Sequence, residues 1–197
     1  LGNVLLASDG VGVEGISKAM NVGSIFRTAH AFGAGFVFTV NASYARGEGG
    51  RADTSSALDH TPFYEFPDMG AMVLPEKCAL VGVELTPESI ELPSFHHPAQ
   101  AAYILGPERA SLSPEMTERC EFVIKIPMQF CGELSIAAAI VMYDRVQSLG
   151  RFQRRPERPG GPSEALPDPV FGEPKFRDQA GKFLSNPPPD VHPQEED

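Results

Sequence analysis

Short apolar runs alternate along the chain with longer segments whose apolar residues recur at helical spacing. The runs that predict strands are residues 4–7, 36–40, 63–66, 79–85, 102–105 and 122–126. Residues 17–32 predict a helix closed by Gly33, residues 134–149 a second long helix, and residues 51–58 a shorter one. Short apolar strands between helices indicate an α/β domain with a parallel sheet and helices on both faces.

Composition divides the chain into a body and a tail. Apolar residues make up 42% and charged residues 21% of the 197 residues, which is typical of soluble globular proteins. Residues 156–197 contain 10 of the 19 prolines, with nine acidic and four basic residues. Few apolar residues and many prolines cannot offset the entropy of ordering, so we expect one domain over residues 1–155 and a disordered or loosely docked tail. In the tail, residues 169–171 and Phe176 are the candidates for packing on the body or a partner.

Charge and cysteine usage exclude several classes of protein. The net charge of −10 argues against broad non-specific binding to nucleic acid, which depends on Lys and Arg, but leaves room for a local basic site. No apolar run approaches the roughly 20 residues that cross a bilayer, and no signal peptide is visible. The cysteines form no CxxC pair, so we expect reduced thiols in a cytoplasmic protein: Cys78, Cys120 and Cys131. The histidines show no ligand-like spacing to these cysteines, so no metal site is expected: His30, His96 and His97.

The first segment with polar residues that do not suit a plain core runs from Asn21 to Thr28. Asn21 is a good N-cap for a helix that starts near Val22, and Gly23 allows close backbone approach. Arg27 has no acid three or four residues away, which leaves it available for a phosphate or a ribose. Spacing alone favours the plainer alternative of a helix cap with a surface arginine.

The second segment is a strand that runs through Gly106 and Pro107 into a polar loop, before a helix capped by Ser113 with Pro114 at its first position. Loops after strand carboxyl ends are where α/β sheets bind ligands, although an ordinary strand–turn–helix reads the same way. A generic nucleotide-binding fold finds no support, because the chain has neither GxGxxG after the first strand nor GxxxxGK[ST].

The third segment is a strand that ends in residues 126–128, followed by a small loop and a helix rich in small residues. The three alanines at 137–139 let another backbone approach closely. This helix is therefore either tightly buried in the core or packed at a subunit interface.

Together and in this order, the three segments resemble the SpoU/TrmH family of the SPOUT superfamily, the RNA ribose 2′-O-methyltransferases. The resemblance extends from about residue 3 to residue 150. Its motifs are residues 21–28, residues 105–108, and residues 126–128 with the alanine-rich helix through Tyr143.

The resemblance implies a C-terminal deep trefoil knot, an exception to the rule against knotted chains. It also implies a homodimer with the last helix in its interface, and a pocket for S-adenosyl-L-methionine formed by the knot. No metal is required. The residues that the resemblance assigns to cofactor binding are Val83, Glu84, Leu85, Leu105, Gly106, Glu108, Ile126, Met128 and Leu134.

The implied reaction is methyl transfer to a ribose 2′-hydroxyl of tRNA or rRNA. The resemblance assigns Arg27 the catalytic role, with Asn21 placing it. A guanidinium group stays protonated up to about pH 12, so Arg27 is poorly suited to act as a base. It is better suited to bind the ribose or phosphate and to stabilise the developing alkoxide.

Glu133 departs from the family pattern, which usually has Asn at this position, and Cys131 stands where the family has a small residue such as Ser. Glu133, the third candidate catalytic residue, either pairs with Arg27 and positions it or neutralises it and repels the RNA backbone. The alternative function is therefore a catalytically impaired, knotted RNA-binding or interaction protein. A nucleophilic role for Cys131 is not needed, because 2′-O-transfer requires no covalent intermediate.

Overall fold

The computed structural model describes residues 9–44, 60–107, 110–128, 133–150 and 152–162. The chain divides into two units, Leu1–Phe152 and Gln153–Asp197. The expected strand at residues 4–7, the expected helix at 51–58 and most of the proline-rich tail lie outside the described residues.

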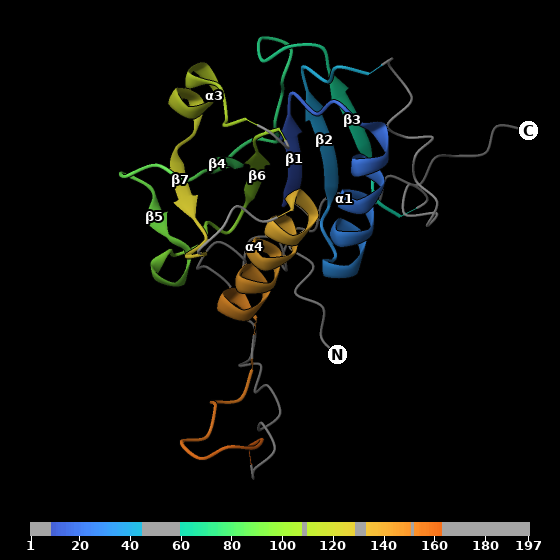
Figure 1. The fold of residues 1–197 in the computed structure, drawn as a ribbon. Helices are drawn as coiled ribbons and strands as arrows, with labels where there is room; N and C mark the ends of the chain where they lie inside the picture. Colours follow the sequence, from blue (N-terminus) through green and yellow to red (C-terminus); the bar gives the residue numbers. More distant parts are fainter. Residues whose placement is uncertain (1–8, 45–59, 108–109, 129–132, 151, 163–197) are drawn as a thin grey trace, which may run out of the picture. The chain divides into compact units, whose positions relative to one another are not determined.

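The first unit is built on a seven-stranded sheet in the order β3-β2-β1-β6-β4-β7-β5 (Figure 1). Every neighbouring pair runs parallel, which confirms the parallel sheet expected from the sequence. The strands are β1 (Gly10–Glu14), β2 (Phe36–Val40), β3 (Phe63–Phe66), β4 (Ala79–Val83), β5 (Ile90–Glu91), β6 (Ala101–Leu105) and β7 (Phe122–Lys125).

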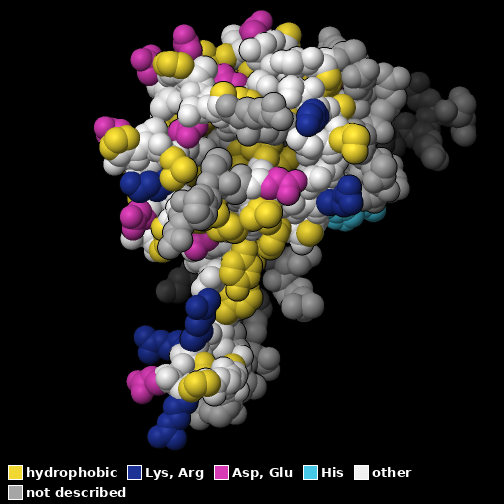
Figure 2. Space-filling view, in the orientation of Figure 1, with side chains coloured by type: hydrophobic (Ala, Val, Ile, Leu, Met, Phe, Trp, Pro, Cys, Tyr) yellow, Lys and Arg dark blue, Asp and Glu magenta, His cyan; other side chains and the backbone are white. Residues whose placement is uncertain are grey.

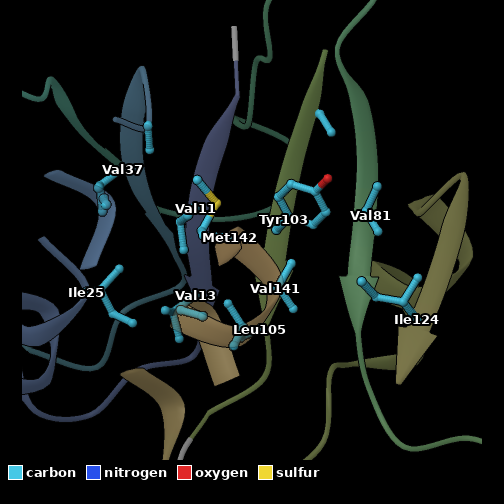
Figure 3. Close-up of a cluster of buried hydrophobic side chains, with 14 of the residues drawn as sticks. Val11, Val13, Ile25, Val37, Val81, Tyr103, Leu105, Ile124, Val141 and Met142 are labelled. Atoms are coloured by element: carbon cyan, nitrogen blue, oxygen red, sulfur yellow. The ribbon is translucent and has the colours of Figure 1, made fainter. Parts of the chain in front are cut away.

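Helices cover both faces of the sheet, as the continuous apolar strands predicted. Helices α1 (Ala19–Phe32) and α4 (Leu134–Leu149) lie against one face (Figure 1). Figure 3 shows part of the core that they form, in which Ile25 of α1 and Val141 and Met142 of α4 belong to one buried cluster with Val11 and Leu105 of the sheet. Helix α3 (Pro114–Arg119) contributes Met116 to a second cluster on the other face. A short 3₁₀ helix, η2 (Leu92–Ser94), follows β5.

Strand β1 lies later in the chain than the run that the hydrophobic pattern singled out. Its sequence alternates Gly and Val, and glycine in a strand is a weak signal because it has no side chain to pack. Here the space is used by aromatic rings, since a Cβ built on Gly10 or Gly12 would lie 2.3 Å from the ring of Phe36 or Phe38. The two-residue β5 was also not expected.

Helix α1 begins before the predicted start near Val22. Its N-cap is Lys18, so Asn21 lies in the first turn and the expected Asn21 cap is wrong. Ala19 and Met20 are good helix formers, which allows the helix to begin earlier. The predicted end is confirmed, because Gly33 adopts the left-handed conformation with φ 71° and its N–H bonds the helix carbonyls.

Arg145 anchors α4 to the amino ends of β1 and β6. Its side chain is 2% exposed, and Nε donates to Asp9 at 3.2 Å. Nη1 donates to the carbonyl of Pro98 and the hydroxyl of Tyr103, and Nη2 to the carbonyl of Ala99. Burial raises the pKa of Asp9, and the nearby guanidinium opposes that shift. Removing one partner of such a buried pair typically costs about 3–5 kcal/mol, so the anchor fixes the course of α4.

His97 extends this buried network through Tyr103. Its Nδ1 lies 2.6 Å from the hydroxyl of Tyr103, and its Nε2 lies 2.9 Å from Asp144. The Asp144 carboxylate only accepts, so the neutral ring donates to it from Nε2 and accepts at Nδ1 from the O–H of Tyr103, whose oxygen accepts from Arg145. Burial lowers the pKa of His97, which favours this neutral form.

Candidate functional site

A pocket of about 310 Å³ opens where β4, β6 and β7 end, beside the first turns of α1 and α4. This edge receives the carboxyl ends of all the parallel strands, and small-molecule sites of α/β proteins lie there. The pocket is lined by Asn21, Ser24, Val83, Glu84, Leu85, Leu105, Gly106, Pro107, Ala110, Lys125, Ile126, Met128, Glu133, Leu134, Ser135 and Ala137.

The structure brings most of the expected site residues together in this pocket. Eight of the nine candidates for cofactor binding line it, and the ninth, Glu108, lies outside the described residues. Asn21 and Glu133 also line it. Three segments that are far apart in the sequence therefore share one site.

Arg27 is placed differently from the other candidates. It is not part of the pocket lining, and its side chain is exposed on α1, where Nε donates to the carbonyl of Gly23 at 3.5 Å. The salt bridges among the described residues do not include one between Arg27 and Glu133. The structure thus shows no such pair among the residues it describes, and the catalytic roles expected of Arg27 and Glu133 stay predictions.

Gly106 lets the chain turn sharply as it leaves β6. A Cβ built at this position would lie 2.8 Å from the backbone nitrogen of Leu112 and 3.0 Å from the carbonyl carbon of Ser111. Both neighbours are backbone atoms, which cannot move aside as the end of a side chain can. Only glycine therefore allows the loop to fold back against the strand end and form this wall of the pocket.

Two carboxylates hold the far part of the same loop, one from each strand that flanks β6. Glu14, at the end of β1, is buried and accepts hydrogen bonds from Ser113 N at 2.8 Å and Ser113 Oγ at 2.6 Å. Glu84, directly after β4, accepts from Leu112 N at 2.7 Å through Oε2 and from Leu85 N at 2.8 Å through Oε1. Three of these charge-assisted bonds, from Leu112 N, Ser113 N and Ser113 Oγ, fix the loop between β6 and α3 beside the pocket, and the fourth, from Leu85 N, holds the Glu84 carboxylate in place.

Ser113 also caps α3, as the sequence predicted. Its Oγ accepts from Met116 N at 3.1 Å while donating to Glu14, so one hydroxyl joins the sheet to the helix. Glu14 was not among the candidates from the sequence. The feature of the sequence that could have indicated Glu14 is its position as an acidic residue directly after the alternating Gly and Val residues of β1.

Lys125 is a pocket residue that sequence reasoning missed. It is half-buried at the end of β7, and its ammonium makes no salt bridge within the described ranges. Glu133, which is exposed before the first turn of α4, likewise has no side-chain cap hydrogen bond. The pocket thus has apolar walls with one positive and one negative group available to a ligand. A charged residue within the apolar run 122–126 was the signal for Lys125.

The remaining reactive groups do not point to a second catalytic chemistry. Burial raises the pKa of Cys78 to about 11 and that of Cys120 to about 12, so both stay protonated thiols near neutral pH. Cys131 lies outside the described residues. Among the residues that are described, no group of three His, Cys, Asp or Glu side chains is arranged to hold a metal ion. No helix within these ranges has the length and apolar character needed to cross a membrane.

Residues 10–143 match the family model of the SpoU rRNA methylases, and this stretch includes all three motif segments and the pocket. The chain belongs to the SpoU rRNA methylase family. This SpoU family member is 28% identical over 138 residues to an uncharacterised tRNA/rRNA methyltransferase of Archaeoglobus fulgidus. That match covers 66% of the chain but only 61% of the relative.

Solved structures share the fold of this family member. The SpoU methyltransferase AviRb from Streptomyces viridochromogenes, in complex with AdoMet, superposes with a TM-score of 0.60 at 24% identity, over 70% of this chain and 59% of that one. An RNA 2′-O ribose methyltransferase superposes with a TM-score of 0.58 at 19% identity, over 71% of this chain and 55% of that one. At these identities the likeness establishes the fold.

Proposed function

We propose that the pocket binds S-adenosyl-L-methionine (AdoMet) and that the protein methylates a ribose 2′-hydroxyl of tRNA or rRNA. The observation that carries the proposal is the convergence of three separate motif segments on one pocket at the carboxyl edge of the sheet. Membership of the SpoU family supports the same activity.

The lining of the pocket fits AdoMet in size and chemistry. Its volume is within the range of small-molecule sites, and Leu105, Ile126 and Leu134 supply apolar walls for an adenine ring. Gly106 has no side chain, so its contribution to the pocket lining is backbone. Lys125 provides a cation for the ligand's carboxylate, and Glu133 an anion for its ammonium or sulfonium group.

When bound, AdoMet supplies an activated methyl group on a positively charged sulfur. The residues of this chain align the acceptor and stabilise its developing negative charge. Ile25 faces the core, whereas Arg27, two residues later, is exposed on α1. Its guanidinium is therefore available to the ribose or an adjacent phosphate. Asn21 and Ser24 line the pocket from the first turns of the same helix, so α1 connects the cofactor site with the RNA site.

The finer features of the family belong to this proposal. The trefoil knot belongs to the proposal through membership of the SpoU family, with the start of α4 beside the loops after β4 and β6. A homodimer through α4 is supported by its exposed apolar residues, with Ile136 50% and Tyr143 55% exposed. Figure 2 shows a continuous strip of hydrophobic side chains along this helix.

Replacing Arg27 by alanine tests the assigned chemistry. Methyl transfer from labelled AdoMet to total tRNA and rRNA should be lost in Arg27→Ala, while the dissociation constant for AdoMet stays within about twofold, since Arg27 lies outside the pocket. Lys18→Ala, which removes an exposed cation beside the same helix, should retain transfer. Equal turnover by Arg27→Ala contradicts the role of Arg27, and a methylated base instead of a methylated ribose contradicts the assigned reaction.

Glu133 favours a second candidate, a non-catalytic RNA-binding protein with the same fold. The side chain lines the pocket, and an acid at this edge would repel RNA phosphates. Glu133→Asn separates the two functions. A large gain in transfer by this variant would support the non-catalytic candidate, whereas substantial transfer by the natural protein supports the enzyme.

A further inference from the structure

The positive charge of this acidic chain is concentrated in one short stretch. Residues 1–150 contain nine Lys and Arg against 17 Asp and Glu, a net charge of −8. Residues 151–158 contain four arginines and one glutamate, a net charge of +3. A polyanionic ligand therefore meets repulsion over most of the chain and attraction at this stretch.

The described part of this stretch leaves its arginines available. Arg154, Arg155 and Arg158 are all exposed, and the salt bridges found among the described residues do not include them. Pro156 and Pro159 interrupt the run and prevent a helix, so the segment follows an irregular course without strands or helices. In Figure 2, Lys and Arg side chains project outward in the region where Figure 1 draws this segment in orange.

We propose that residues 153–158, which we term the arginine segment, bind the sugar–phosphate backbone of RNA. Guanidinium groups bind phosphate through paired hydrogen bonds and remain charged at every physiological pH. The choice of RNA as the polyanion rests on the proposed function, because the proposed methyl transfer needs an RNA acceptor. The binding of phosphates by Arg154, Arg155 and Arg158 is independent of the chemistry in the pocket.

The length of chain is suited to this role. Arg158 is nine residues beyond Leu149, the last residue of α4, so the segment reaches at most about 30 Å from the helix end. Contacts to phosphates fix the position of RNA but carry no base information. The arginine segment therefore supplies affinity, whereas the choice of nucleotide belongs to the surface around the pocket.

The salt dependence of RNA binding tests the proposal. The variant Arg154→Gln/Arg155→Gln/Arg158→Gln removes three positive charges from an exposed irregular segment, which leaves the core untouched. Its matched control is Lys175→Gln/Arg177→Gln/Lys182→Gln, which removes the same charge from the acidic tail. Fluorescence anisotropy with a short labelled single-stranded RNA, between about 50 and 200 mM salt, gives the dissociation constant and its salt slope.

Loss of three phosphate contacts should reduce the slope of log K against log salt by about 2 and weaken binding by on the order of 10- to 100-fold near 0.1 M salt. The control variant should keep the slope of the natural protein, and replacement of the three arginines by lysine should retain most of it. Unchanged affinity and slope in the glutamine variant would overturn the proposal. Tighter binding of the natural protein to phosphatidylserine vesicles than to RNA at the same salt would overturn it too.

The outcome is independent of the proposed methyl transfer. Titration of both variants with AdoMet shows whether the pocket is intact, and neither variant should change that affinity. A reduced salt slope in a protein that does not bind AdoMet supports the arginine segment and contradicts the methyltransferase. Normal AdoMet binding together with an unchanged salt slope in the glutamine variant contradicts RNA binding by the arginine segment and supports the methyltransferase.

Discussion

Replacing Glu14 by glutamine tests how firmly the loop between β6 and α3 is held beside the pocket. The buried carboxylate accepts from both Ser113 N and Ser113 Oγ. Glutamine retains one acceptor oxygen but directs an NH₂ group toward a donor. A hydrogen bond to a charged group contributes about 1.5–3 kcal/mol, and a weakened Ser113 cap adds about 1 kcal/mol. We therefore expect a loss of about 2–4 kcal/mol from the free energy of unfolding, a large share of the roughly 5–15 kcal/mol typical of a domain.

Urea unfolding of Glu14→Gln gives this loss directly, and titration with AdoMet reports the effect on the pocket. The affinity should fall, because the loop that carries Ala110 and Leu112 is released from the end of β1. Glu115→Gln is the matched control, since Glu115 is exposed in the first turn of the same helix and contributes only about 0.3–1 kcal/mol through the helix dipole. Equal free energies of unfolding for Glu14→Gln and Glu115→Gln would refute the conclusion that Glu14 holds the loop through Ser113.

Three further predictions concern the buried network, the pocket cation and the thiols. Burial lowers the pKa of His97, so the unfolded chain binds this proton at higher pH than the folded one. The stability that neutral His97 contributes is complete above about pH 6.5 and falls as the pH drops below it; a denaturation series in His97→Gln should show a shallower decline, and an identical one would contradict this. Lys125→Met should weaken AdoMet binding by about 10- to 100-fold in calorimetry, as expected for one charge-assisted hydrogen bond, and an unchanged affinity would remove Lys125 from the site. Cys78 and Cys120, with pKa values of about 11 and 12, should resist alkylation at pH 8 until the protein unfolds. Peptide mapping that finds rapid modification of both thiols in the folded protein would contradict their raised pKa values.

The elements predicted most closely from the sequence are those with a strong local pattern. Helix α4 has the predicted bounds, and α1 ends at Gly33 as expected, because a long apolar helical run and a C-terminal glycine are local signals. Strand β1 was missed because two of its positions are glycines. Their missing side chains leave space for the rings of Phe36 and Phe38, which belong to another strand. The start of α1 was misplaced because Asn21 is a good N-cap in isolation, and the preceding Ala19 and Met20 extended the helix.

Some residues of the candidate site were likewise predicted from the sequence, and others were not. Motif segments placed Leu105, Ile126 and their neighbours in one pocket, because a family resemblance contains information about tertiary arrangement that local pattern lacks. The roles of Glu14 and Lys125 depend on which strand ends meet at the sheet edge. That order of strands, with β6 between β1 and β4, is not encoded in any single segment.

Calorimetric titration of the full chain with AdoMet is the most direct test of the pocket. Binding with a micromolar dissociation constant, equivalent to about −8 kcal/mol, is expected for the natural protein. Gly106→Val should abolish it, since its added side chain meets the backbone of Leu112. A folded natural protein that shows no heat of binding, with AdoMet or with its demethylated product, would contradict the assignment of this pocket to the cofactor and leave the non-catalytic RNA-binding protein as the remaining function.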